Sequence, residues 1–149
     1  MAKRDISLRG RALAMLARRE HTRAEMARKL SPHAESPEQV DQLLDALIAR
    51  GWLSETRFAE SRANTLTRKF GSRKIEHDLR SRGVSADVVE QTVARALSEE
   101  LENCRAAWRR KFGVLPQDAA ERGRQMRFLA GRGFSADAVR QVLKAGDDD

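Results

Sequence analysis

The sequence contains few cysteines, few histidines and no long apolar run, and each shortage excludes a class of protein. One cysteine among 149 residues cannot form an internal disulfide, so the fold must depend on packing, as in proteins of a reducing compartment. One cysteine and three scattered histidines also offer no ligand set at zinc spacing. No segment is apolar enough to span a bilayer, and residues 1–11 are too highly charged for a signal peptide. We therefore expect a cytoplasmic protein that has no membrane contact and no cofactor.

The common patterns of catalytic residues are also missing. No glycine-rich loop is followed by lysine and then serine or threonine, so ATP hydrolysis is not expected. His77 and Asp78 are neighbours, but adjacent side chains on a helix point about 100° apart, which favours an exposed polar surface. The serines fall at positions typical of helix caps. We expect no catalytic site, and hence a protein that is not an enzyme.

What the sequence does contain is a threefold internal repeat. The pattern serine, any residue, acid, any residue, valine, any residue, glutamine begins at Ser36, Ser85 and Ser135, at offsets of 49 and 50 residues. Between residues 82–91 and residues 132–141, seven of ten positions are identical. Each copy is typical of a helix start, because serine accepts hydrogen bonds from free amides and the acid lies near the positive end of the helix dipole.

Glycine and apolar spacing complete the prediction of the fold. Gly83 and Gly133 are placed to end a preceding helix in a left-handed conformation, and residues 31–36 form a longer turn in the first copy. Apolar residues recur at helical spacing, and no alternating strand pattern is present. We predict an all-α fold in one domain, residues 1–149, built as an elongated, curved array of three tandem three-helix repeats at about 5–53, 54–97 and 98–145. Trp52, Trp108 and the phenylalanines are expected to pack at the junctions between repeats, in preference to the alternative of a ligand-binding or base-stacking role.

Positive charge is concentrated in the first two helices of each repeat. Residues 3–29, 57–82 and 105–132 hold 25 of the 29 Lys and Arg but 8 of the 22 Asp and Glu, a net charge of +17, whereas the rest of the chain has a net charge of −10. Some cations recur every seven residues and are expected to lie on helical stripes: Arg4, Arg11 and Arg18; Arg62 and Lys69; Arg73 and Arg80. Stacked repeats would align these stripes into a long basic surface, which suits an extended polyanion or a charged polymer better than a small ligand.

Several runs carry a resemblance to a known family. They are residues 17–25 (ARREHTRAE), 51–59 (GWLSETRFA), 70–75 (FGSRKI) with 79–84 (LRSRGV), and 127–135 (RFLAGRGFS). With these runs the chain resembles the RecX family over almost its whole length. The resemblance implies a bacterial negative regulator of the RecA recombinase, with roles in DNA repair, DNA recombination and the SOS response. Such a regulator lodges in the groove of the RecA filament on DNA, disfavours its extension, and so inhibits strand exchange, ATP hydrolysis and coprotease activity.

We expect the RecA filament to be bound by a basic surface on the second and third repeats of a monomer, with contact to single- or double-stranded DNA also open. Its residues are Arg57, Arg62, Arg68, Lys69, Arg73, Lys74, Arg80, Arg82, Arg109, Arg110, Lys111 and Arg127.

Two other functions remain open from the sequence. Three short helices with a tight turn also describe a helical DNA-binding module that acts on DNA directly, and such a module would bind bare DNA with a steep salt dependence. A helical scaffold for other proteins is the third, and basic residues scattered evenly around the helices would favour it.

Overall fold

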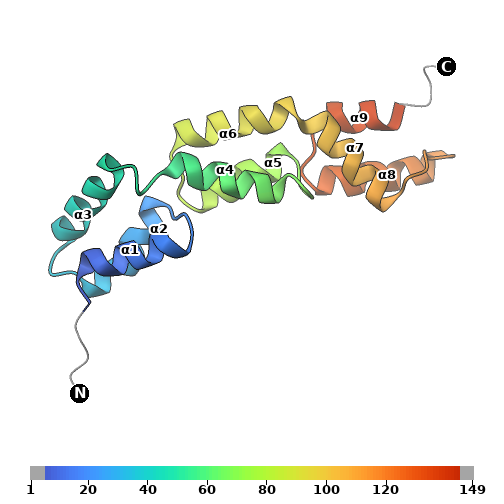
Figure 1. Cartoon of the computed structure of the whole chain (residues 1–149). Coiled ribbons are helices and arrows are strands. Elements are labelled where there is room, and N and C mark those ends of the chain that lie inside the picture. Colours follow the sequence, from blue (N-terminus) through green and yellow to red (C-terminus); the bar gives the residue numbers. More distant parts are fainter. Residues whose placement is uncertain (1–5, 145–149) are drawn as a thin grey trace.

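The computed structural model describes residues 6–144, and these residues form an elongated, curved array of helices (Figure 1). No strand occurs among them. The first unit comprises α1 (Leu8–Arg18), α2 (Arg23–Leu30) and α3 (Pro37–Ala49), with a 3₁₀ turn, η1 (Ser31–His33), before α3. The second comprises α4 (Glu55–Leu66), α5 (Ser72–Ser81) and α6 (Ala86–Ser98). The third comprises α7 (Glu100–Lys111), α8 (Ala119–Gly131) and α9 (Ala136–Lys144). The all-α array of three-helix repeats is confirmed.

The repeated serines begin the third helix of each unit, though not all by the same chemistry. Ser36 Oγ accepts from the Gln39 amide at 3.2 Å, and Ser135 Oγ accepts from the Ala138 amide at 3.2 Å, as predicted. The Ser85 hydroxyl makes no such bond, so the prediction of a side-chain cap is wrong there. The Ser85 amide instead donates to Glu55 Oε2 at 3.2 Å, which ties the start of α6 to α4.

The predicted glycine turns are confirmed by their backbone angles. Gly83 and Gly133 have φ values of 78° and 90°, in the left-handed region that a side chain disfavours. In the first unit η1 carries the chain out of α2, and Pro37 is the first residue of α3, where its missing amide costs no hydrogen bond.

Each unit has an apolar core of its own. Leu30, Leu79 and Leu129 occupy equivalent places in the three cores and are almost completely buried. Trp108 packs against the third core, and its indole N–H donates to Gln125 Oε1 at 2.8 Å. Trp52 was expected to pack between units, and this is wrong: its side chain is 42% exposed and lies beneath the guanidinium groups of Arg9 and Arg50.

The second and third units are joined through the start of α5. The Gly71 amide donates to the Arg132 carbonyl at 2.9 Å, and the Arg73 amide donates to the Gly133 carbonyl at 3.2 Å. Between them, the buried Glu100 carboxylate accepts from the Ser72 amide at 2.8 Å and from its hydroxyl at 2.9 Å. The third unit therefore satisfies three successive amides at the N-terminus of α5, which α5 itself cannot satisfy.

Candidate interaction surface

Basic side chains from three segments meet where the second and third units join. Helix α4 ends at Leu66, and the turn that follows carries Arg68 and Lys69; its shape is fixed by the Lys69 and Phe70 amides, which both donate to the Leu66 carbonyl. The last turn of α7 contributes Arg110 and Lys111. Arg132 follows α8, where its carbonyl accepts from Gly71.

These side chains surround a recess that we term the junction hollow. It has a cavity volume of about 190 Å³, and the residues lining it are Lys69, Ala107, Arg110, Lys111, Phe128 and Arg132. No acidic residue is among them. The junction hollow therefore presents four cationic side chains over an apolar floor.

Two phenylalanine rings hold several of these cations in place. The Arg132 guanidinium carbon lies 5.3 Å from the Phe70 ring centroid and 5.1 Å from that of Phe128. Lys111 Nζ lies 5.3 Å from the Phe128 centroid, and Lys74 Nζ lies 5.5 Å from the Phe70 centroid. Each contact is worth about 0.5–1 kcal/mol at an exposed site, so the rings favour one arrangement of otherwise mobile side chains.

The four cations of the junction hollow have no acidic partner within residues 6–144. None of Lys69, Arg110, Lys111 and Arg132 takes part in an ion pair there. Arg110 is held instead by a hydrogen bond to the Arg68 carbonyl in the turn that follows α4. Within the described residues, no ion pair therefore neutralises any of these four side chains.

The junction between the first and second units differs, because its arginines are paired with carboxylates. It contains a hollow of about 380 Å³ lined in part by Arg19, Arg62 and Arg82. Arg62 forms a two-pronged ion pair with Asp78 at 2.9 and 3.0 Å, and Arg82 approaches the same carboxylate at 3.1 Å. Arg19 pairs with Glu25. Charge in this hollow is largely neutralised within the protein.

The Asp78 carboxylate pairs with two of the three arginines that line this hollow. Its side chain is 21% exposed, and hydrogen bonding from Arg62 lowers the pKa of Asp78 against the opposing effect of burial. The same interaction raises the pKa of Arg62. Both groups therefore stay charged and paired, which leaves Arg62 poorly placed to bind a partner.

The twelve residues predicted to bind the filament therefore divide into two groups. Four are paired with acids of this chain: Arg57 with Glu20, Arg62 and Arg82 with Asp78, and Arg80 with Glu76. Among the residues the structure describes, the other eight make no ion pair, and all eight are exposed: Arg68, Lys69, Arg73, Lys74, Arg109, Arg110, Lys111 and Arg127. We call these eight the open cations.

One of the predicted helical stripes is wrong, because α4 ends at Leu66 and Lys69 lies in the turn beyond it, off the helix that carries Arg62. Arg73 and Arg80 do share α5, and Arg11 and Arg18 share α1. Arg4 lies outside the described residues. The basic surface is therefore assembled from helix ends and turns as well as from helical faces.

Sequence reasoning missed Arg132 and the two phenylalanines beside it. Arg132 occupies the repeat position of Arg82, which was included, so the internal repeat offered a signal for it. Phe70 and Phe128 gave no comparable signal, because a phenylalanine at helical spacing is more often a core residue.

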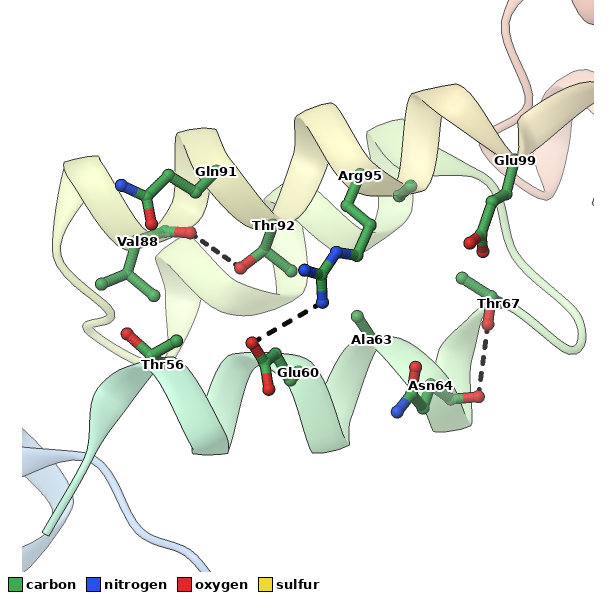
Figure 2. Close-up of a pocket in the computed structure, with 11 residues that line it drawn as sticks. Thr56, Glu60, Ala63, Asn64, Thr67, Val88, Gln91, Thr92, Arg95 and Glu99 are labelled. Atoms are coloured by element: carbon green, nitrogen blue, oxygen red, sulfur yellow. Dashed lines mark hydrogen bonds and ion pairs between the residues drawn. The ribbon is translucent and has the colours of Figure 1, made fainter. Parts of the chain in front are cut away.

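The remaining hollows and titratable groups do not form an alternative site. A smaller groove, of about 100 Å³, runs between α4 and α6, where Arg95 reaches across to Glu60 at 3.6 Å (Figure 2).

Cys104 is fully buried, and burial raises the pKa of its thiol to about 12, so it is not a nucleophile. Residues 6–144 contain no group of three or more His, Cys, Asp or Glu side chains placed to hold a metal ion. Within the same residues, no helix has the length and apolar character needed to cross a membrane.

Family models match all three units in chain order. The models describe the first, second and third three-helix domains of RecX, and they match residues 9–47, 54–93 and 98–143. The three matches together cover most of each helix from α1 to α9, and α6 extends five residues beyond the second match.

Curated proteins are similar over nearly the whole chain. A protein named "Regulatory protein RecX" from Chromobacterium violaceum is 48% identical over 151 residues, covering 100% of this chain and 97% of its own length. Proteins of the same name from Leptothrix cholodnii and Ralstonia nicotianae are 49% and 40% identical, and cover 96% and 99% of this chain and 91% and 92% of their own lengths.

Solved structures share the fold. The crystal structure of RecX from Lactobacillus salivarius superposes with a TM-score of 0.77 at 18% identity and covers 94% of both chains. A second crystal structure, of "regulatory protein RecX", gives a TM-score of 0.74 at 18% identity and covers 91% of this chain and 70% of its own.

Proposed function

The chain belongs to the RecX family, and from that premise we propose that it is a negative regulator of the RecA recombinase. It binds in the groove of the RecA filament on DNA and blocks or destabilises filament extension. Inhibition of strand exchange, of ATP hydrolysis by the filament and of its coprotease activity follows from binding alone, without catalysis by this chain. The protein acts in the cytoplasm as a monomeric, single regulatory domain.

The observation that carries this proposal is the gathering of open cations on the second and third units. All eight come from α5, α7, α8 and the turn after α4, the elements that meet at the junction of these units. An extended helical polymer offers repeated contact points to such a surface, whereas a small ligand would use one of them. The elongated shape of the array also suits a groove (Figure 1).

Several weak contacts made at once account for preferential binding to the filament over free RecA. Exposed charge pairs are individually worth less than about 1 kcal/mol. When they are linked on one rigid body, each contact raises the effective concentration for the next. We therefore expect strong binding to an assembled filament and weak binding to a RecA monomer.

The test is a RecA-dependent strand-exchange and ATPase assay with a charge-reversed variant. Arg68, Arg73 and Arg109 are exposed and make no ion pair in residues 6–144, so their replacement by Glu should leave the fold intact by circular dichroism. We expect the unmodified protein to inhibit at well below one copy per RecA, and the triple variant to require at least tenfold more protein.

A matched control carries the same charge change at other positions: Arg18→Glu, Arg28→Glu and Lys144→Glu, all exposed cations that lie away from the second and third units' junction. Equal loss of inhibition in both variants would mean that only net charge matters. Absence of inhibition by the unmodified protein at equimolar RecA, together with tight binding to bare DNA, would favour the direct DNA-binding module.

A further inference from the structure

We propose that the junction hollow between the second and third units is a binding site for a phosphodiester group of a nucleic-acid strand. The inference rests on the proposed function and deepens it, because it assigns one part of the basic surface to DNA and not to RecA. It concerns four side chains, Lys69, Arg110, Lys111 and Arg132, that line a single recess.

The first argument is the local charge. Cations elsewhere on this chain are repeatedly matched with carboxylates, as Arg62, Arg82 and Arg57 illustrate. In the junction hollow four cations converge from three segments, and in residues 6–144 none of the four makes an ion pair. Such an arrangement is self-repelling until an anion occupies it, so it favours an anionic ligand.

The second argument is shape. The cavity volume of about 190 Å³ is more than ten times the roughly 10–15 Å³ that one water molecule requires, so the recess has room for a phosphate group. It contains two guanidinium groups, whose planar forks match phosphate oxygens, and two ammonium groups, which act as point charges. Cations spread along one exposed helical face would not line a common recess in this way.

The third argument is the use of the aromatic rings. Base stacking needs a free ring face, yet Phe128 already carries Lys111 and Arg132 at 5.3 and 5.1 Å from its ring centroid. The rings orient the cations, which favours contact with the backbone and no preference for base sequence. Arg68 and Arg109 are exposed and adjoin recess residues in the chain, and the exposed Arg73 and Lys74 lie at the start of α5, which is hydrogen-bonded to Arg132 and Gly133. These four offer further cations for the successive charges of a nucleic-acid strand.

The test uses the full chain without RecA. Binding of a fluorescein-labelled 20-nucleotide oligothymidylate, and of the same length of duplex, is measured by anisotropy over a range of salt concentrations. The variant Lys69→Gln with Lys111→Gln removes two exposed ammonium groups and leaves Arg110 and Arg132 in their present contacts. Its control, Arg18→Gln with Arg28→Gln, removes the same charge from the first unit.

We expect the junction variant to bind the single strand at least tenfold more weakly, with a log–log salt slope smaller in magnitude by about 1.4, which is two contacts at about 0.7 each. The control should change the affinity less than threefold. Equal weakening in both variants, or an unchanged salt slope in the junction variant, would overturn the proposal.

Two further readouts separate this inference from its alternatives. If polyglutamate competes for the junction hollow as strongly as an oligonucleotide of equal charge, the site recognises acidic protein segments and the proposal fails. If the junction variant keeps full oligonucleotide binding but loses RecA inhibition, the phosphate assignment fails while the proposed regulation stands. If the unmodified protein binds DNA through Lys69 and Lys111 yet never inhibits RecA, the regulation fails and the phosphate site stands.

Discussion

At the scale of single residues, the first unit depends on a carboxylate that is only partly exposed. Glu25 accepts hydrogen bonds from the Arg19 guanidinium, and Lys29 Nζ lies 3.3 Å from its Oε1. These cations lower the pKa of Glu25 to about 2, chiefly through the bond from Arg19. Beside it, burial lowers the pKa of His21, whose Nδ1 lies 2.9 Å from the Arg19 carbonyl oxygen.

Because the pKa values of Glu25 and His21 are both lowered on folding, a fall in pH destabilises the folded protein. A carboxylate whose pKa is depressed on folding contributes stability that is complete above its unfolded pKa of about 4.5 and is lost as the pH falls towards 2. We expect Glu25→Gln to be less stable than the unmodified protein at pH 7 but to lose less stability between pH 4.5 and pH 2. Urea unfolding followed by Trp52 fluorescence, in a Trp108→Phe background so that Trp108 does not contribute to the signal, measures this in the same unit.

The control for that measurement is Glu35→Gln, because Glu35 is exposed, lies between η1 and α3 and has no ion partner in the described part of the chain. Its pH profile should run parallel to that of the unmodified protein. A parallel profile for Glu25→Gln as well would show that the contacts of Glu25 do not stabilise the fold.

At the scale of elements, two glycines near the end of α8 make a matched pair. A Cβ on Gly133 would lie 2.5–2.9 Å from atoms of Lys74, and φ there is +90°. A Cβ on Gly131 would meet nothing within 4 Å. We expect Gly133→Ala to cost about 2–4 kcal/mol from left-handed strain and overpacking, and Gly131→Ala to be neutral or stabilising by up to about 1 kcal/mol. Similar urea midpoints for the two variants would contradict this account of the turn.

The start of α5 offers a second prediction at this scale. Glu100 is 3% exposed and accepts two hydrogen bonds from Ser72. Glu100→Ala leaves the Ser72 amide without a partner and should cost about 2–3 kcal/mol in urea unfolding. Glu100→Gln retains an acceptor oxygen and should cost roughly half as much. Glu102→Ala, an exposed neighbour on α7, should stay within about 0.5 kcal/mol, and an equal effect of all three would exclude a specific cap.

These elements show what the sequence predicts well. Helix starts at Ser36 and Ser135 and turns at Gly83 and Gly133 are local features, because the residue that determines each lies within a few positions of its effect. The threefold repeat then extends the local pattern to the fold.

Long-range contacts are where the sequence is insufficient. The sequence predicts that Glu100 is an ordinary acid in the first turn of a helix. No neighbouring residue in the sequence indicates that its partner is Ser72 on α5. In the same way, the basic stretches were visible, but their division into paired and open cations depends on where Asp78, Glu20 and Glu76 come to lie in space.

At the scale of the whole molecule, the two junctions differ in construction. The second and third units share backbone hydrogen bonds and the buried Glu100. Within residues 6–144 no backbone hydrogen bond crosses from the first unit to the second; instead Arg57 Nε donates to Glu20 Oε1 at 2.9 Å beside two hollows of about 380 Å³ each. The second and third units should therefore move as one body, with the first unit turning against them.

Spin-label distances measure this directly. Cysteines introduced at Ala46, Ala94 and Ala130 place one exposed label on each unit, and Cys104 can remain because its buried thiol, with a pKa of about 12, does not react. We expect a broader distance distribution for the pair 46–94 than for the pair 94–130. Arg57→Ala, or added salt, should broaden the first distribution and leave the second unchanged, because an exposed ion pair is screened whereas buried hydrogen bonds are not. Gly133→Ala should broaden the distribution for the pair 94–130 and leave that for the pair 46–94 unchanged. Equal widths that respond neither to Arg57→Ala nor to Gly133→Ala would mean that all three units form one rigid array.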